Sequence, residues 1–477
     1  MRAGRCGEHG VGGLVRRGAF FGPVGWRRRF CGSGGPQLCV SNTHLPQGQA
    51  VIYQSWGFTG SPFQTTSLPA SELGDQLLVG RDAELGTLMR RIASPPKIAT
   101  LEGLNGVGKT SVVNVACYKL FTQHVQSGTG PLYVPCRRSF QLNPGQDLQS
   151  FMDGVLMEVA QTLIDRADYI RRTNPGLHTV AINRWLNSAQ LVSFQAGAFS
   201  VQAGYQSETN TSSGYERSGF RKAVAGILEH IFPDAETGGV VCTIDNLELL
   251  QSSDAARQQL EQLRDELLNM QGLRWVLCGA LGIVYGVVAS PRLEGYLHTP
   301  IEVGEISDRH AADILSSRLG AYTSGAPGQY LPLLPEDFAR LYELLRGNLR
   351  SVLSYADDYC QWVADREAPK EQERKRQVFD CWLLAQAAAA HTAVRQELRP
   401  RAQQVFRKAV DVGGVFSPSD YEDFEFNSVQ AFRPSIRDLE AVGLLVSTQD
   451  DGDKRRKTIQ ITPKGWFVDM HLRRDEA

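Results

Sequence analysis

The sequence has no apolar run of about 18 residues, the length that a transmembrane helix needs. We therefore expect no membrane partner and a cytoplasmic location. The chain also has almost no net charge, −1 at pH 7 over 477 residues, so no global field attracts nucleic acid and any DNA binding must come from a local patch. Its 9 cysteines include no CxxC pair and no histidine at zinc spacing, which argues against a structural zinc site and fits a reducing compartment.

Acidic residues are almost absent from the first 70 residues, which contain seven arginines and one carboxylate, Glu8. Because this part is rich in glycine and has little periodicity, we predict that residues 1–75 form a disordered basic segment and that order begins near Leu77. An Arg-rich, acid-poor composition is also typical of organelle transit peptides, and an over-extended translation start is a third interpretation. Whether residues 1–70 belong to the mature chain stays open.

Against these absences stands one complete motif. Residues 103–110 read Gly-Leu-Asn-Gly-Val-Gly-Lys-Thr and fit the phosphate-loop pattern G-x-x-x-x-G-K-[ST]. An apolar run, 98–101, precedes the motif and an amphipathic stretch, 111–121, follows it, so the loop lies between a predicted strand and a predicted helix. This context disfavours the alternative of an ordinary glycine-rich turn with a stray lysine.

The residue types of this loop suit a triphosphate. Glycines allow backbone angles that point successive N–H groups inward at phosphate oxygens, and the helix that follows adds its positive end. Lys109 would reach the β- and γ-phosphates, and the Thr110 hydroxyl would bind Mg²⁺. The cofactors predicted are therefore ATP and Mg²⁺. The predicted nucleotide-binding residues of the loop are Gly103, Asn105, Gly106, Val107, Gly108, Lys109, Thr110 and Ser111.

A second run of strand-forming residues, 239–244, ends at Asp245. A carboxylate at the carboxyl end of a buried parallel strand beside a phosphate loop can hold Mg²⁺ through water, so we assign Thr110 and Asp245 to the metal. Glu248 is a candidate for orienting the attacking water, although a solvated carboxylate at a helix start explains it equally well. The predicted catalytic residues are Lys109, Asp245 and Glu248.

The chain from 76 onward alternates apolar runs of strand length with helical segments, which predicts an α/β fold with a parallel, doubly wound sheet. The predicted strands are 98–101, 131–136, 239–244 and 275–278. Residues 187–219, rich in Gly, Ser, Thr and Gln, suggest a hairpin or a mobile insert and a contact surface for a protein partner. The predicted domains are a P-loop ATPase domain (76–305), a helical lid (306–368), a helical connector (369–400) and a winged-helix domain (401–477).

The winged-helix prediction comes from the order of elements near the C-terminus. Helices are predicted at 418–426 and 428–442. A strand beginning at 443, a charged turn at 450–457 and a second strand at 458–462 follow them.

With these residues in view, the chain resembles the AAA+/STAND class of signalling ATPases, especially origin-recognition-like bacterial members, over roughly 76–365. Val79-Gly80-Arg81 with Glu84-Leu85 resembles the entry motif of that class, and Gly347-Asn348-Leu349-Arg350 resembles its sensor-2 motif. The resemblance implies that Val79 lies near adenine and that Arg350 touches the phosphates and reports the nucleotide state. Pro291-Arg292-Leu293 lies where origin-type members carry an arginine-bearing box, so Arg292 is a candidate finger toward a neighbouring subunit. A solvated arginine at a helix end is at least as good an explanation.

Two departures from that class bear on hydrolysis. Asn246 stands where strongly hydrolysing members have Glu, and Cys278-Gly279 replaces the usual polar residue at the sensor-1 position. Both favour slow turnover, or a switch held by nucleotide, over a motor.

The terminal block resembles the MarR-type winged helix. Leu439-Glu440-x-x-Gly443-Leu444-Leu445, Asp453-x-Arg455-Arg456 and Ile461-Thr462-x-x-Gly465 follow the order of that family. The resemblance implies a second helix in the major groove and a wing arginine near the minor groove. The possible nucleic-acid contacts are Arg433, Arg437, Arg455 and Arg456. In the alternative, the domain only packs against the ATPase core, and the acidic residues of 420–425 would repel phosphate.

The first hypothesis for function is an ATP-binding, slowly hydrolysing switch whose nucleotide state controls the winged helix and drives self-association. The alternative is a DNA-binding regulator or loader whose affinity ATP modulates. A third possibility is a sensor that recognises a partner protein. The trigger, the DNA site and the oligomeric state cannot be derived from the residues.

Overall fold

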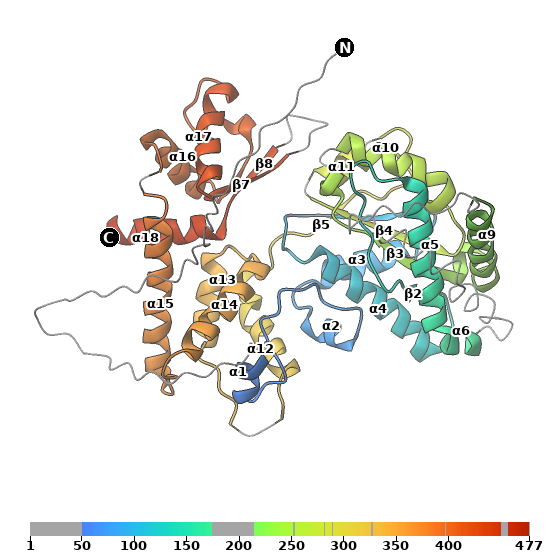
Figure 1. The fold of residues 1–477 in the computed structure, drawn as a ribbon, viewed down its shortest axis with the longest axis horizontal. Coiled ribbons are helices and arrows are strands. Elements are labelled where there is room, and N and C mark those ends of the chain that lie inside the picture. The colour runs from blue at the N-terminus through green and yellow to red at the C-terminus, as the bar shows by residue number, and fades with distance from the viewer. Residues whose placement is uncertain are drawn as a thin grey trace, which may run out of the picture. The chain divides into compact units, whose positions relative to one another are not determined.

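A computed structural model of the chain describes residues 50–173, 214–250, 253–280, 282–288, 290–325, 328–395, 397–449 and 457–476. Arg455, Arg456 and most of the predicted insert at 187–219 lie outside these residues, as does the first part of the predicted basic segment. The elements of the described part are shown in Figure 1.

A parallel sheet forms the centre of the first half of the described chain. Its strand order is β2-β3-β4-β1-β5, and each neighbouring pair is parallel. The predicted α/β class and parallel sheet are confirmed. The last strand was not predicted, because two residues give no periodic signal. The strands are β1 (Ala99–Glu102), β2 (Leu132–Pro135), β3 (Gly238–Ile244), β4 (Leu273–Gly279) and β5 (Ile301–Glu302).

Helices cover both faces of this sheet (Figure 1). Tyr133 and Val241 face the core formed with α3 (Asp82–Ile92) and α4 (Lys109–Ser127). Their neighbours along the same two strands, such as Val134 and Val240, point to the opposite face and belong to the larger core there. Because both faces are buried, the strands read as continuous apolar runs. The second core includes α5 (Leu148–Asp165), α6 (Ala167–Thr173), α9 (Gly214–Ile231), α10 (Ser253–Leu263) and α11 (Ile283–Val288).

The second half of the described chain is mainly helical and shares one hydrophobic core. A small antiparallel sheet, in the order β6-β8-β7, lies in its last part. Among the described helices, none combines the length and the apolar character that crossing a bilayer requires. The elements are α12 (Ala311–Ala321), α13 (Pro335–Leu344), α14 (Leu349–Ala364), α15 (Gln372–Thr392), α16 (Pro400–Asp411), β6 (Val415–Phe416), α17 (Val429–Ala441), β7 (Leu445–Gln449), β8 (Lys457–Ile461) and α18 (Pro463–Glu476).

The helix predicted at 428–442 is present as α17, but the helix predicted at 418–426 is wrong. That segment has only a 3₁₀ turn, Pro418–Asp420, followed by turns. The Ser417 hydroxyl and the Asp420 carboxylate each accept a backbone N–H in a capping box, so side chains here satisfy the backbone in place of a helix. The left-handed backbone of Glu425, with φ +60°, ends the segment.

The predicted disorder of 1–75 is also wrong for its last third. Residues 50–75 include α1 (Ala50–Ser55) and most of α2 (Glu72–Leu77). Three aromatic side chains in this stretch belong to the helical core, with exposed fractions of 1–3%: Tyr53, Phe58 and Phe63. Tyr53 lies on the short helix α1, whereas Phe58 and Phe63 lie in the irregular chain after it, so the stretch has no amphipathic period that sequence reading could detect.

Candidate functional site

The phosphate-loop motif joins β1 to α4, as its flanks predicted. Gly103 is required by a close approach, since a Cβ there would lie 2.3 Å from the carbonyl oxygen of Val303. Gly106 has a φ of +87°, and a Cβ on it would lie 3.1 Å from Oδ1 of Asn348. The loop is thus confined between the chain beyond β5 and the start of α14, and glycine alone fits both positions.

Lys109 folds back across the loop. Its side chain is 6% exposed, and Nζ donates to the carbonyl oxygens of Gly103 at 2.9 Å and Leu104 at 3.2 Å. The ammonium therefore lies among backbone groups of the loop itself. A phosphate oxygen placed there would replace these carbonyls as its hydrogen-bond acceptor.

Thr110 and Asp245 are brought into direct contact. The Thr110 hydroxyl donates to Oδ2 of Asp245 at 2.6 Å, and the aspartate is 5% exposed at the end of β3. Its other oxygen accepts the N–H of Asn246 at 3.0 Å. A hydroxyl and a carboxylate are the hard oxygen ligands that Mg²⁺ prefers, so the pair fits the predicted metal. The described residues contain no cluster of three or more His, Cys, Asp or Glu side chains that could hold a metal.

Most of the predicted nucleotide-binding residues line one cleft. Gly103 is the exception, because it is packed beneath Val303. Asn246 borders the same cleft. The predicted residues along it are Val79, Asn105, Gly106, Val107, Gly108, Lys109, Thr110, Ser111 and Arg350.

The sensor-2-like segment lies directly over the loop. Asn348 caps α14 by accepting the N–H of Ser351 at 3.2 Å. A Cβ on Gly106 would lie 3.3 Å from Cβ of Arg350, whose side chain is exposed beside the cleft. The resemblance that pointed to Arg350 therefore agrees with its position.

The carboxylate of Glu248 is hydrogen-bonded to backbone, and the side chain of Cys278 is enclosed in the core. Oε2 of Glu248 accepts the N–H of Ala280 at 2.9 Å, which holds the chain just beyond β4. Cys278 is fully buried, and burial followed by the nearby Asp245 charge raises its pKa well above the usual value. The thiol is thus neutral. The catalytic role of Glu248 stays a prediction, and its carboxylate is engaged by backbone.

Arg81 ties the loop to the sheet, a role that sequence reasoning missed. It is 3% exposed; Nη1 contacts Oε1 of Glu84 at 2.8 Å. Nη2 donates to the carbonyl oxygens of Val107 at 3.0 Å and Gly304 at 2.6 Å. The guanidinium, which also borders the cleft, therefore fixes the phosphate loop to the chain that follows β5. The available signal was an arginine inside the entry motif with a glutamate one helical turn later.

Residues 61–69, which we call the strap, form a second wall of the cleft. The Leu68 N–H donates to Oγ of Ser111 at 3.0 Å, and Nδ2 of Asn114 donates to the Leu68 carbonyl at 2.7 Å. At the other end, Nη1 of Arg318 on α12 donates to the carbonyls of Pro62 at 2.9 Å and Gln64 at 3.2 Å. The strap thus connects the helix that follows the phosphate loop to the helical core, across the cleft.

Arg318 is a buried cation at the inner end of this strap. Its side chain is 4% exposed, and its Nε has no hydrogen-bond partner. Burial lowers the pKa of Arg318 to about 10, so it remains charged near neutral pH. Neither Arg318 nor the strap was predicted from the sequence.

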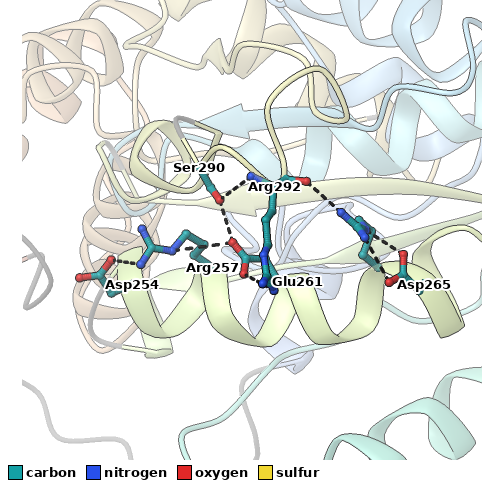
Figure 2. Close-up of polar contacts among 7 residues, drawn as sticks. Asp254, Arg257, Glu261, Asp265, Ser290 and Arg292 are labelled. Atoms are coloured by element: carbon teal, nitrogen blue, oxygen red, sulfur yellow. Dashed lines mark hydrogen bonds and ion pairs between the residues drawn. The ribbon is translucent and has the colours of Figure 1, made fainter.

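Arg292 lies beside α10 and belongs to a surface network with side chains of that helix (Figure 2). It is 76% exposed, and Nη1 lies 3.6 Å from Oε2 of Glu261. Ser290 donates to Oε1 of the same glutamate at 2.7 Å, and Arg257 approaches it from α10. This placement agrees with a solvated arginine, and the finger role stays a prediction.

In the terminal block, Arg433 and Arg437 lie exposed one turn apart on α17. Among the described residues neither forms an ion pair. The nearby acidic side chains do: Glu425 contacts Lys408 at 2.7 Å, and Asp438 lies 3.8 Å from Arg399.

Comparisons with known proteins give low overall similarities. No protein-family model matches the chain, and no curated protein matches it significantly. Similar solved structures include the ORC1 protein of Aeropyrum pernix in complex with DNA (17% identity, TM-score 0.38, 84% of this chain and 96% of that chain covered). The ORC2 protein of Aeropyrum pernix, in ADPNP–ADP complexes, is 11% identical with a TM-score of 0.42, covering 87% of this chain and 98% of that one. Cdc6p of Pyrobaculum aerophilum is 14% identical with a TM-score of 0.35, covering 87% and 98%. The chain is thus similar to origin-recognition and Cdc6-type proteins.

Proposed function

We propose that the chain binds ATP with Mg²⁺ in the cleft above β1 and β3 and acts as a slowly hydrolysing switch. The observation that carries this proposal is the 2.6 Å contact between the Thr110 hydroxyl and Asp245, beside a loop that encloses Lys109. A phosphate loop and a strand-end aspartate that share one point are what a Mg²⁺–triphosphate complex requires. The parallel sheet supports it, because ligands bind at the carboxyl ends of such strands.

The residues divide the work of binding. Loop N–H groups and the start of α4 hold phosphate oxygens, and Lys109 exchanges the carbonyls of Gly103 and Leu104 for the β- and γ-phosphates. Thr110 and Asp245 hold the metal, which supplies positive charge that offsets the charge of the phosphates. Asn246 is a poor proton acceptor, and the carboxylate of Glu248 is engaged by the Ala280 N–H, so neither of these two side chains is a free base for the attacking water. Hydrolysis is therefore slow.

The switch acts through the helical lid. Arg350 extends beside the loop, where a γ-phosphate attracts its guanidinium and draws α14 toward the P-loop domain. The strap transmits the same movement, since it is fastened to α4 through Asn114 and to α12 through Arg318. Self-association in the ATP state remains part of this proposal, and mass measurement with ADP and with a non-hydrolysable ATP analogue tests it.

The test of the nucleotide site is Lys109→Ala, assayed by titration with a fluorescent ATP analogue. We expect binding to be lost, because the ammonium that neutralises the phosphates is removed. Lys97→Ala is the matched control: this exposed lysine precedes the same strand at its opposite end, and its removal leaves the affinity unchanged. Undiminished affinity in Lys109→Ala would remove the site assignment.

A second candidate function is an ATP-modulated DNA-binding regulator or loader that uses the terminal block as a winged helix. Two observations favour it: helix, helix and antiparallel strands follow one another as in that fold, and Arg433 and Arg437 are exposed without ion-pair partners among the described residues.

A salt titration of duplex DNA binding separates the two functions. If these arginines contact phosphates, affinity falls steeply with salt, and replacing both by Ala reduces the slope by about one per contact. Replacing Arg257, which is paired with Asp254 on α10, is the control and leaves the slope unchanged. A slope that is the same in all three proteins rejects the DNA function and leaves the nucleotide switch standing.

A further inference from the structure

A pair of thiols lies at the edge of the parallel sheet, away from the nucleotide cleft. Cys136 directly follows β2, the edge strand, and its N–H donates to the carbonyl oxygen of Val241 at 3.0 Å. This bond continues the parallel register, in which Pro135 pairs with Val241, by one residue and places Cys136 opposite Cys242. Neighbouring strands stand about 4.8 Å apart. That separation falls inside the range of about 4.4–6.8 Å between the Cα atoms of disulfide-bonded cysteines.

The two side chains also point to the same face of the sheet. Cys242 belongs to the core that includes α5, and Cys136 packs against that core. Cys117 belongs to the core on the opposite face with α4. The backbone of the sheet therefore separates Cys117 from the pair, and among the cysteines that the structure describes Cys242 is the partner that Cys136 can reach.

The two thiols differ in chemical state. The hydrogen bond from the Cys242 thiol, with a further one from the Arg138 N–H, lowers the pKa of Cys136 against the effect of burial. Thr162 places its hydroxyl 3.7 Å from the same sulfur. Cys242 is fully buried, and burial raises its pKa. A sulfur whose pKa is lowered is thus held beside one whose pKa is raised.

Accessibility favours Cys136 as the site of first reaction. It is half-buried at the end of an edge strand, whereas Cys242 has no exposed surface. Residue 136 therefore retains surface at which a small oxidant can approach the pair, whereas Cys242 retains none.

We propose that Cys136 is a peroxide-reactive thiol that forms a disulfide with Cys242. In the first step the Cys136 sulfur attacks a hydroperoxide: an S–O bond forms, the O–O bond breaks, and the alkoxide or hydroxide takes up a proton and leaves. The sulfur is oxidised to a sulfenic acid and the peroxide is reduced. In the second step the Cys242 sulfur attacks the sulfenic sulfur, an S–S bond forms, the S–O bond breaks, and the Cys242 proton leaves with the hydroxyl as water. The oxidised bond ties β2 to β3.

The test treats the reduced full-length protein with stepwise hydrogen peroxide, blocks free thiols by alkylation and maps peptides by mass spectrometry. Cys381 is the internal control, because it is an exposed thiol on α15. We expect a linked Cys136–Cys242 peptide at peroxide levels that leave Cys381 several-fold less oxidised, and its loss on adding dithiothreitol. Oxidation of Cys381 before the pair, or a link from Cys136 to any other cysteine, overturns the proposal.

Two variants refine the result. In Cys242→Ser the second step is blocked, so a sulfenic acid should accumulate at Cys136 and be trapped by dimedone. In Cys117→Ser the linked peptide should form as in the unaltered chain. Absence of the dimedone adduct in the first variant, or loss of the link in the second, also rejects the assignment. The measurement on the unaltered protein does not rely on any variant being folded, and none of these readouts depends on nucleotide binding.

Discussion

The two walls of the cleft are built in opposite ways. The phosphate loop is a contiguous run of residues whose backbone faces the cleft, and its position is set by glycines and by the buried guanidinium of Arg81. The strap has polar, exposed side chains along the cleft, Gln64 to Ser67, and is held only at its ends by side chains of other elements. They include Asn114 and Ser111 at one end. At the other end they include Arg318, Asp357 and Phe338.

This difference separates binding from coupling. A wall made of backbone amides keeps its shape whatever the rest of the chain does, which suits a phosphate site. A wall suspended between α4 and α12 changes whenever those helices move relative to each other, which suits a device that reports lid position. Substitutions in the two walls should therefore act on different properties of the protein.

The largest effect should follow from removing the buried guanidinium of Arg81 that bonds to the loop. Arg81→Met leaves the carbonyls of Val107 and Gly304 without their donor and Glu84 without its ion pair, so we expect the free energy of unfolding to fall by about 3 kcal/mol. Urea denaturation measures it. Arg90→Met, on the exposed side of the same helix, should change stability by less than about 0.5 kcal/mol. Equal effects of both substitutions would show that the loop does not depend on Arg81.

Asp245→Asn tests the metal-binding part of the nucleotide site. The amide keeps a similar shape but removes the negative charge, so ATP affinity in the presence of Mg²⁺ should fall by about 10- to 100-fold, while affinity in EDTA changes little. Calorimetric titration with and without Mg²⁺ gives both values. Asp254→Asn on α10 removes a carboxylate that pairs with Arg257 and should alter neither. An equal loss with and without the metal would contradict a metal role for Asp245.

The loop wall could be predicted because its information is local. The motif, the apolar strand before it and the run ending at Asp245 are each readable in a few adjacent residues. The contact between Thr110 and Asp245 then follows from a general rule, since parallel strands align their carboxyl ends. The strands of the sheet were found for the same reason, apart from β5, whose two residues carry no pattern.

The strap and its anchors could not be predicted because their contacts join residues that are far apart in the sequence, and no local pattern marks them. Phe63 is buried against the ring of Phe338, far along the chain, and Arg318 bonds to backbone carbonyls that any residue could supply. Glycine-rich, basic sequence upstream made the whole region resemble a disordered tail. The error after Pro418 was of the opposite kind, since a helix was predicted where the chain forms turns. The acidic residues there are compatible with a helix, but they bind backbone groups of the turns.

A smaller effect should follow from loosening one end of the strap. Asn114→Ala removes the donor to the Leu68 carbonyl, which costs about 1 kcal/mol locally, so amide exchange across residues 64–68 should accelerate about fivefold. ATP affinity should stay unchanged, because Asn114 does not line the cleft. Thr122→Ala, which removes a hydroxyl bonded within its own helix, is the control for exchange. If Asn114→Ala weakens ATP binding as strongly as Asp245→Asn, the two walls do not have separate roles.

The smallest effect concerns the opposite end of the sheet, where no wall of the cleft lies. His298 pairs its backbone with Ile98 before β1, and burial, then Arg91 and Lys97, lower the pKa of its ring below the ordinary 6.5. Below pH 6.5 the unfolded chain therefore takes up a proton that the folded chain resists, and stability falls as pH decreases toward the folded pKa. His298→Gln should flatten this part of the stability–pH curve. Thermal melts between pH 5 and 7, a range of about two pH units around the titration of the histidine, would show this. Because the ring lies at the amino ends of the strands, ATP affinity at each pH should be the same in both proteins, and a difference would mean that stability at this edge reaches the phosphate loop.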